Sequence, residues 1–354
     1  MKNASLYIDL HAIQTVPPSC VNRDDTGSPK TAVYGGVERA RISSQAWKRA
    51  MRAYFKTIFA EEMLGSRTKQ VPKMIAEEIV TADPSIAPEK ALKLAMETLK
   101  KIGIKTDDKE NENAALFFIS KQQTKALAKL AAAGETNKDA YKQAIKDYPS
   151  LDIALFGRMV ADDPSLNYDA AAQVAHAIST HGVQTEYDYF TAVDDEQAED
   201  ESGAGHLGTV EFNSATLYRY ATVNVTELAA NLGTDTAHVV RGFAEAFACS
   251  MPTGKQNTFA NRTLPDMLYI TVRRDQPVNL SGAFEKAVKN DKNGYVEKSC
   301  ESLLAYADKL YNSFAEKPEQ AWGCGDAQLL ASDAEALSMK DLLERIENYV
   351  EGAL

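Results

Sequence analysis

Basic side chains gather in one short stretch of an otherwise acidic chain. Residues 19–52 contain seven Lys and Arg residues against three Asp and Glu residues, whereas the 354-residue chain has a formal net charge of −11. Such a group of cations can bind an anionic polymer through its phosphates. The alternative is that the charges only solvate an ordinary surface helix. The basic residues are Arg23, Lys30, Arg39, Arg41, Lys48, Arg49 and Arg52.

The residues around these cations predict a loop followed by a short strand. Two turn-forming sequences, DTGSP and GG, bound the loop, which carries Arg23 and Lys30. Residues 37–43 then alternate between polar and apolar side chains, which predicts a half-buried strand with Arg41 and Ser43 on its polar face. Loop and strand can therefore face one anionic strand together.

A helix is predicted to follow the strand directly. Ser43 or the next serine can act as its N-cap, and apolar residues then recur at helical spacing over residues 47–58. Lys48 and Arg52 lie four residues apart on a different face of this helix. Gln45 falls in the first turn, where free backbone N–H groups and the helix dipole favour a phosphate.

A second candidate for phosphate contact is the Gly254-Lys255-Gln256 sequence. It lacks the first glycine of a nucleotide-binding phosphate loop, and Gln256 replaces the required hydroxyl residue. Nucleotide hydrolysis is therefore not expected. A glycine beside a lysine and a glutamine suits an RNA phosphate, and an ordinary connecting loop is the alternative.

The chain has no recognisable catalytic, metal or cofactor motif. The lipase-type, zinc-protease and dinucleotide-binding motifs are all missing. His176 and His181 would diverge on a helix, so a structural role is predicted for both, and the four scattered cysteines are interpreted as reduced thiols. No apolar run reaches the ~18 residues of a membrane helix and no signal peptide is recognised, so the predicted location is the cytoplasm.

Two changes of character follow the basic stretch. Residues 58–181 show mostly helical patterns, including a predicted helix over 168–179, and are interpreted as an inserted domain. Residues 182–213 favour a strand, a turn and a returning strand, and nine acids but no Lys or Arg lie between Glu186 and Glu211. Composition alone favours a mobile loop; the alternative is a protruding hairpin.

The remaining parts, 1–57 and 214–354, predict an α+β core. Residues 217–225, 237–248 and 267–274 form a strand, a helix and a strand, which is a β-α-β run. Apolar residues alternate with polar ones over residues 6–11, which predicts a first strand. With this strand and the basic helix, the β-α-β run predicts an RRM- or ferredoxin-like core interrupted by the helical insertion. Such a sheet commonly exposes one face to single-stranded RNA. The lack of an RNP-type aromatic motif favours contact with RNA phosphates over base stacking.

Two lysine stripes lie within the predicted insertion. In each, three lysines are spaced four apart, which places them on one helix face. A solvated face is the ordinary explanation, and contact with the phosphates of a DNA duplex is the alternative. The stripes are Lys121, Lys125 and Lys129, and Lys138, Lys142 and Lys146.

Several longer motifs occur along the whole chain. They are Pro18-Ser19-Cys20, Asn22-Arg23-Asp24-Asp25, Gly35-Gly36, residues 41–45 and 48–52, LFGRMV at 155–160, DYFTAVDD at 188–195, HLGT at 206–209, and Gly254-Lys255-Gln256. Together they resemble the CasC family, the backbone subunit of the type I-E CRISPR Cascade complex within the RAMP superfamily. One departure is Val37, where some relatives carry a lysine.

The resemblance implies a palm, fingers and thumb architecture for a non-catalytic protein. The palm would be the RRM-like core, the fingers the helical insertion, and the thumb the hairpin over residues 182–213. The implied partners are a CRISPR guide RNA, target DNA, further copies of the chain in a head-to-tail filament, and other Cascade subunits. No membrane partner and no cofactor are implied.

The resemblance also implies roles for particular residues. Met159 would press on an RNA base, although core packing is its ordinary explanation, and His206 with Leu207 would form the apolar wedge of the thumb. The candidate DNA contacts are Lys121, Lys125, Lys138 and Lys142. The candidate RNA-binding residues are Arg23, Lys30, Arg41, Ser43, Gln45, Lys48, Arg52, Met159, Lys255 and Gln256.

Two other functions remain open from the sequence. Related RAMP proteins are endoribonucleases that process guide RNA precursors, and such an activity would need a His or Lys beside the bound phosphate. His11 is the only histidine close to the basic stretch in sequence. A small-molecule enzyme is the third alternative, which the lack of an acid–base or metal constellation disfavours.

Overall fold

The computed structural model describes residues 5–192, 206–290, 292–326, 329–330 and 334–354. The chain divides into two compact units, each built from three separate segments. The first unit comprises residues 1–51, 174–222 and 244–345, and the second comprises 52–173, 223–243 and 346–354.

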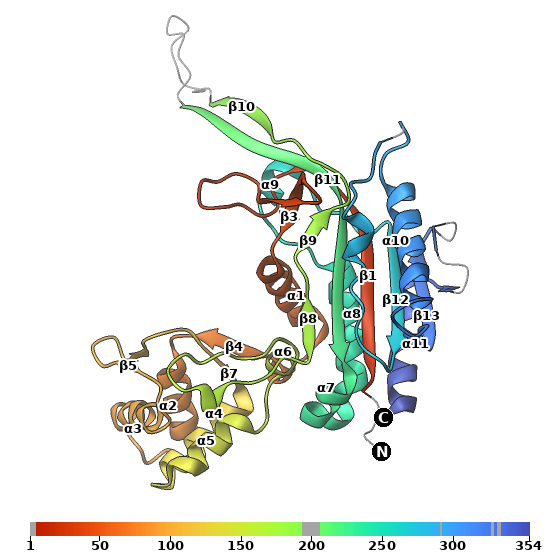
Figure 1. Cartoon of the computed structure of the whole chain (residues 1–354). Coiled ribbons are helices and arrows are strands. Elements are labelled where there is room, and N and C mark those ends of the chain that lie inside the picture. The colour runs from red at the N-terminus through yellow and green to blue at the C-terminus, as the bar shows by residue number, and fades with distance from the viewer. Residues whose placement is uncertain (1–4, 193–205, 291, 327–328, 331–333) are drawn as a thin grey trace, which may run out of the picture. The chain divides into compact units, whose positions relative to one another are not determined.

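A large mixed sheet organises the first unit (Figure 1). The β13–β14 pair is parallel. The other neighbouring pairs whose register is defined are antiparallel. Strands β10 and β8 also pair with β11. In spatial order the strands are β14 (Glu335–Ala336), β13 (Gln320–Gly325), β12 (Met267–Arg273), β1 (Tyr7–Ser19), β11 (His206–Asn224), β9 (Ala177–Ser179), β3 (Val37–Ile42) and β2 (Thr31–Tyr34), with β10 at Glu186–Ala192 and β8 at Ala172–Val174.

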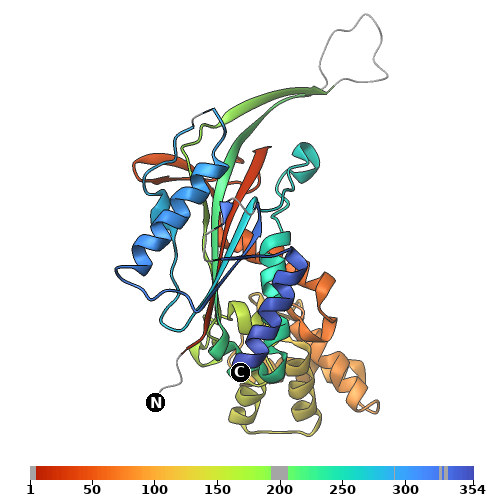
Figure 2. The ribbon, with the colours of Figure 1, turned by 90° about the vertical axis from the view of Figure 1, so that its right-hand side faces the viewer.

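Helix α10 (Val296–Tyr311) covers one face of this sheet (Figure 2). Leu303 and Ala307 of α10 pack in a buried cluster with Ile13, Tyr218 and Tyr269 from three adjacent strands. The 3-10 helix η4 (Ser281–Phe284) contributes Phe284 to the same cluster. Burial of this apolar surface is what holds α10 on the sheet.

Helix α1 (Ser44–Ile58) is the basic helix predicted from the sequence, and its first half packs on strands of the same unit. Trp47 lies in a buried cluster with Val16, Ile42 and Leu217. The Arg219 guanidinium lies 3.6 Å from the centre of the Trp47 ring. The predicted N-cap is confirmed, because Ser43 Oγ accepts a hydrogen bond from the Ala46 N–H at 3.3 Å.

Strands β10 and β11 form a hairpin whose register pairs residues 186–192 with residues 206–212 (Figure 1). Both predicted strands are therefore confirmed over these residues, whereas the predicted turn lies outside the described residues. Every residue of β10 is exposed. At the base of the hairpin, the Phe212 ring lies 5.8 Å from the Phe259 ring of the short helix α9 (Gln256–Phe259).

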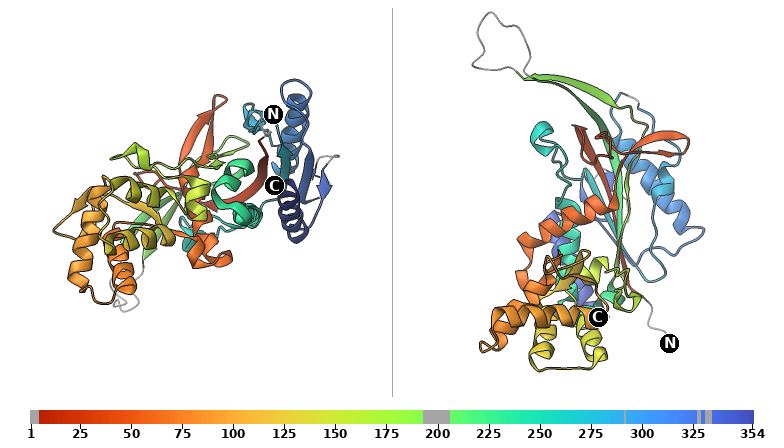
Figure 3. Two further views of the ribbon diagram at one scale, coloured as in Figure 1. Left: turned by 90° about the horizontal axis from the view of Figure 1, so that it is seen from below. Right: turned by 90° about the vertical axis from the view of Figure 1, so that its left-hand side faces the viewer.

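The second unit is built around a cluster of four helices, coloured orange to yellow in Figure 3. Ile75, Leu99, Leu127 and Ile145 each contribute a fully buried side chain to one apolar core. The helices are α2 (Val71–Ala82), α3 (Pro88–Lys101), α4 (Lys121–Ala132) and α5 (Lys138–Lys146).

Shorter elements complete both units. In the second unit these are η1 (Glu61–Met63), β4 (Gly65–Thr68), β5 (Thr106–Asp107), β6 (Glu112–Asn113), β7 (Phe117–Ser120), α6 (Leu151–Phe156), η2 (Pro164–Leu166), α7 (Val225–Leu232) and η3 (Gly233–Asp235). Two further helices, α8 (Thr236–Cys249) and α11 (Met339–Ala353), have residues in both units.

The predicted α+β class is confirmed, and so are a helix in the 237–248 region and a strand at 267–273. The predicted helix over residues 168–179 is wrong, because this segment contains β8 and β9. Ser179 and Ile178 pair with Leu217 and Tyr218 of β11. This long-range pairing overrides the helical preference of an alanine-rich sequence.

None of the helices in the described ranges is long and apolar enough to cross a bilayer. The palm, fingers and thumb boundaries implied by the resemblance stay predictions.

Trp47→Ala is expected to lower the free energy of unfolding by about 3–5 kcal/mol, because the side chain is 1% exposed and its removal leaves a cavity. Arg49→Ala, on the exposed side of the same helix, is the matched control, with a change within about 0.5 kcal/mol. Urea unfolding followed by circular dichroism measures both. Equal midpoints for the two variants would contradict the packing described here.

Candidate nucleic-acid interface

Three predicted phosphate-binding residues of the first unit act electrostatically on one histidine. The positive charges of Arg41, Lys30 and Lys48 all act on the His176 imidazole. Each of the three cationic side chains is only half-buried, so its charge remains accessible to a ligand. We call Lys30, Arg41 and Lys48 the cationic cluster.

Backbone contacts bring the loop of this cluster to the start of α1. The Lys30 N–H donates to Asn22 O at 2.8 Å, and the Arg41 N–H donates to Lys30 O at 2.9 Å. Asn22 Oδ1 accepts from the Ser43 N–H at 2.9 Å. The loop, the end of β3 and the first turn of α1 are therefore one connected structure. Gln45, in that first turn, is exposed.

The loop itself is stabilised by its own side chains. Asp24 Oδ1 accepts hydrogen bonds from the Thr26 N–H at 2.9 Å and from the Ser28 N–H at 3.0 Å. Hydrogen bonds from Thr26 and the backbone hold the pKa of Asp24 below its usual range. The carboxylate is thus used within the turn, and Arg23 beside it remains exposed.

The Gly254-Lys255-Gln256 sequence lies against this same loop. A Cβ atom on Gly254 would stand 2.1 Å from Val21 O, so only glycine permits this approach. The charges of Arg23 and Lys255 both act on the buried Cys20 thiol, whose pKa is nevertheless raised, chiefly by burial. The structure therefore brings Lys255 to the loop that carries Arg23, while Gln256 begins the short helix α9.

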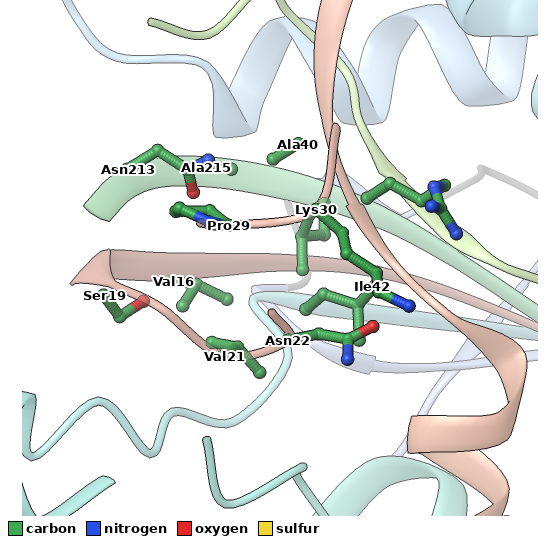
Figure 4. Close-up of a pocket in the computed structure, with 12 residues that line it drawn as sticks. Val16, Ser19, Val21, Asn22, Pro29, Lys30, Ala40, Ile42, Asn213 and Ala215 are labelled. Carbon is green, nitrogen blue, oxygen red and sulfur yellow. The ribbon is translucent and has the colours of Figure 1, made fainter. Parts of the chain in front are cut away.

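A small pocket opens beside the cationic cluster (Figure 4). Lys30 and Asn22 lie at one side of it and Asn213 at the other. Its volume of about 20 Å³ fits a single water molecule and not a nucleobase. Asn213 lines the pocket, and its Nδ2 is buried and has no hydrogen-bond partner in the described part of the chain. This pocket therefore cannot admit a base.

His11 is not at this surface, which corrects the expectation that it is the histidine nearest the basic residues. It is fully buried, and its Nδ1 lies 2.9 Å from the Tyr218 hydroxyl oxygen. Burial, with a smaller effect of Arg273, lowers the pKa of His11 to about 3. The histidine of the site is His176, whose imidazole Nδ1 lies 3.2 Å from Arg41 Nη1. The sequence did not predict that His176 lies beside Arg41. Its local pattern favoured a helix over residues 168–179, whereas pairing of β9 with β3 brings His176 to the site.

Arg52 belongs to the second unit and has structural partners there. Its Nε donates to Asp152 Oδ2 at 2.9 Å, and its guanidinium lies 4.4 Å from the centre of the Phe118 ring. Arg52 Nη2 also donates to Gly65 O at 3.3 Å. The Arg52 guanidinium is thus used in contacts within the second unit, whereas the cationic cluster belongs to the first unit.

Met159 is not packed in the core, which was its ordinary explanation. It is 86% exposed, although both neighbours in sequence are buried. The Arg158 guanidinium donates to three backbone oxygens at 3.1 Å, those of Leu166, Phe118 and Ile145. Burial lowers the pKa of Arg158 to about 10. Met159 is therefore held outward by a well-anchored neighbour.

The lysine stripes are only partly free for contact with DNA. Lys142 Nζ lies 2.7 Å from Asp163 Oδ2, and Lys121 Nζ lies 3.8 Å from Glu62 Oε1. Lys125 and Lys138 are exposed. In the hairpin, Leu207 is 54% exposed, as an apolar wedge requires.

No group of three or more His, Cys, Asp or Glu side chains that could hold a metal ion occurs among the described residues.

A family model matches nearly the whole chain. The family described as CT1975-like protein (Cas_CT1975) matches residues 8–350 of this chain. This chain belongs to the CT1975-like Cas family. No curated protein matches the chain.

Chains from two solved structures are similar to this CT1975-like chain. One chain, from a structure described as "CRISPR RNA-guided surveillance complex, pre-nicking", is 33% identical with a TM-score of 0.83, over 98% of this chain and 100% of that chain. Another, from a structure described as "CRISPR RNA-guided surveillance complex", is 30% identical with a TM-score of 0.64 over the same shares. The resemblance to a CRISPR-associated surveillance-complex subunit is thereby confirmed, whereas the backbone role and the assignment to type I-E stay predictions.

In this CT1975-like chain, Arg158→Lys is expected to lower the free energy of unfolding by about 2 kcal/mol or more, because lysine cannot serve three carbonyls in the plane of a guanidinium. NMR of the Met159 methyl group is expected to show greater motion in this variant. Met159→Ala is the control, with a change in stability within about 0.5 kcal/mol, since its side chain is exposed. Unchanged stability of Arg158→Lys would show that the buried guanidinium does not anchor this segment.

Proposed function

We propose that this protein is a non-catalytic, RNA-binding backbone subunit of a Cascade-type CRISPR surveillance complex. The observation that carries the proposal is the cationic cluster at the start of α1, in a chain similar along its length to chains of CRISPR RNA-guided surveillance complexes. The cluster combines half-exposed cations with a helix N-terminus, which is chemistry suited to phosphates.

On this proposal the protein holds the guide RNA by its backbone and leaves the bases free. Lys30, Arg41, Lys48, Gln45 and Ser43 would contact phosphates, with Arg23, Lys255 and Gln256 extending the path along the loop. Sequence specificity then comes from pairing of the guide with target DNA and not from the protein. The small size of the neighbouring pocket supports this, because it cannot admit a base.

We further propose the finer architecture of an RRM-like palm in the first unit, helical fingers and a thumb hairpin. The order β12-β1-β11 followed by β9 and β3, with a helix between β11 and β12, supports the palm. Several copies would associate head to tail along the RNA, and because such an interface is open, the length of the RNA would limit the filament.

Lys48→Ala is expected to weaken binding of labelled single-stranded RNA about tenfold at low salt, since a hydrogen bond to a charged group is lost. It should also reduce the salt dependence of log K by about 0.7 for each phosphate contact removed. Lys317→Ala, an exposed lysine of the same unit far along the sheet order from the cluster, is the control. Equal effects of both substitutions, or no RNA binding by the wild type at low salt, would contradict the proposal.

An endoribonuclease is the second candidate, because a histidine lies within the cationic cluster. His176 beside Arg41 is an arrangement in which imidazole can take a proton from a ribose hydroxyl while cations stabilise the phosphate.

RNA bound to the wild-type protein is expected to remain intact during long incubation, as gel electrophoresis would show, if the subunit is non-catalytic. Cleavage by the wild type that His176→Gln abolishes would establish the endoribonuclease instead. Cleavage that survives in His176→Gln would exclude His176 as the base. Repurification from a second source of protein would then remove a contaminating nuclease but not an activity of another residue of this chain.

A further inference from the structure

His176 is the histidine beside the cationic cluster, and the RNA-binding proposal above gives it no role. It lies between β8 and β9 and is exposed, with Nδ1 3.2 Å from Arg41 Nη1. The register of the sheet puts it there, because Ala177 of β9 pairs with Ile42 and Ile178 pairs with Arg41 of β3. Its charged neighbours are Arg41 on β3, Lys30 on the loop and Lys48 on α1.

The contact with Arg41 defines the protonation state of the His176 imidazole. A guanidinium can only donate hydrogen bonds. Nδ1 of His176 must therefore be the unprotonated acceptor, and the ring is neutral in the absence of a ligand. Partial burial, followed by the charges of Arg41, Lys30 and Lys48, lowers the pKa of His176 below its ordinary value, in agreement with the geometry.

We propose that His176 is a further phosphate-binding residue of this site, and that it takes up one proton when an RNA phosphate binds to the cationic cluster. This inference rests on the proposed function. The neutral ring accepts from Arg41 and so occupies one N–H of the guanidinium. Protonation of Nδ1 ends that hydrogen bond, and both Nδ1–H and the released Arg41 N–H become donors for phosphate oxygens.

A bound phosphate supplies the charge that makes this protonation favourable. In the free protein an imidazolium would face three cations and gain no carboxylate partner among the groups that act on it. A phosphate at the cluster offsets these positive charges and attracts the imidazolium directly. The pKa of His176 is therefore raised in the complex relative to the free protein.

The direction of the pH dependence follows from linkage. RNA affinity increases as the pH falls through the pKa of His176 in the complex, because the complex binds one proton more than the free protein. The increase ends once the pH is below the pKa of the free protein, since both states are then protonated. Between the pKa of His176 in the free protein and its pKa in the complex, RNA affinity rises by up to about tenfold for each pH unit, for each His176 that is protonated.

The test measures binding of an oligouridine at about pH 5.5 and pH 8 at constant low salt, a range in which histidine titrates but uracil and phosphodiesters do not. We expect the wild type to bind at least about tenfold more tightly at the lower pH, and His176→Gln to bind equally at both. His176→Lys, with a permanent charge, is expected to bind tightly at both. His238→Gln, a histidine of the second unit paired with Glu347, should retain the wild-type dependence.

Wild-type affinity that is equal at both pH values, or a full pH dependence in His176→Gln, would overturn the inference. A second measurement separates its failure from failure of the proposed function. The pKa of the His176 imidazole is followed by NMR with and without sulfate, an anion that does not titrate in this range. If the protein does not bind RNA at either pH, the proposed function fails. In that case a rise of the His176 pKa with sulfate still establishes the proton-linked anion site. No rise of that pKa with sulfate overturns the inference.

Discussion

The buried guanidinium of Arg219 determines where the basic helix lies on the sheet. It is stacked 3.6 Å from the centre of the Trp47 ring and 4.5 Å from that of Phe247. Its Nη1 donates to Gln14 Oε1 at 2.6 Å. Burial lowers the pKa of Arg219 to about 9. A buried charge is tolerated only with such partners. The elements that supply Arg219 and its partners, β11, β1, α1 and α8, must therefore pack in one arrangement. That arrangement fixes the positions of Ser43, Gln45 and Lys48 at the start of α1.

The cations of this acidic chain fall into two classes that a count of charges cannot separate. Arg39, Arg158 and Arg219 are buried and use their guanidinium groups to satisfy backbone carbonyls. Lys30, Arg41 and Lys48 keep part of their side chains accessible. The formal charge of −11 describes the whole chain, whereas a ligand responds to the local field of the second class. Burial, which depends on the fold, decides which cations can bind an anion.

Local patterns predicted much of the architecture, and long-range pairing explains what they missed. Periodicity and capping were sufficient for the helix that begins after Ser43 and for the strand that begins at Met267. For the site, they indicated Lys30, Arg41 and Lys48, which the fold brings together. They failed for residues 168–179, because β8 and β9 exist only through their pairing with β11. His176 enters the site through the same pairing, which no local propensity encodes.

The carboxylates of the hairpin are divided unequally between its two faces. Side chains alternate along a strand, so Tyr187 and Tyr189 share a face with Leu207, whereas Glu186 and Asp188 lie on the other. Carboxylates near phosphates would cost free energy. The exposed tyrosines and Leu207 can instead contact bases or apolar surface without that cost. Over the described residues, Glu211 is the one acid on the face of Leu207, where it pairs with Tyr187, whereas Phe190 and Val210 share the other face with Glu186 and Asp188. Both faces therefore carry apolar side chains, and the face of Leu207 has fewer carboxylates.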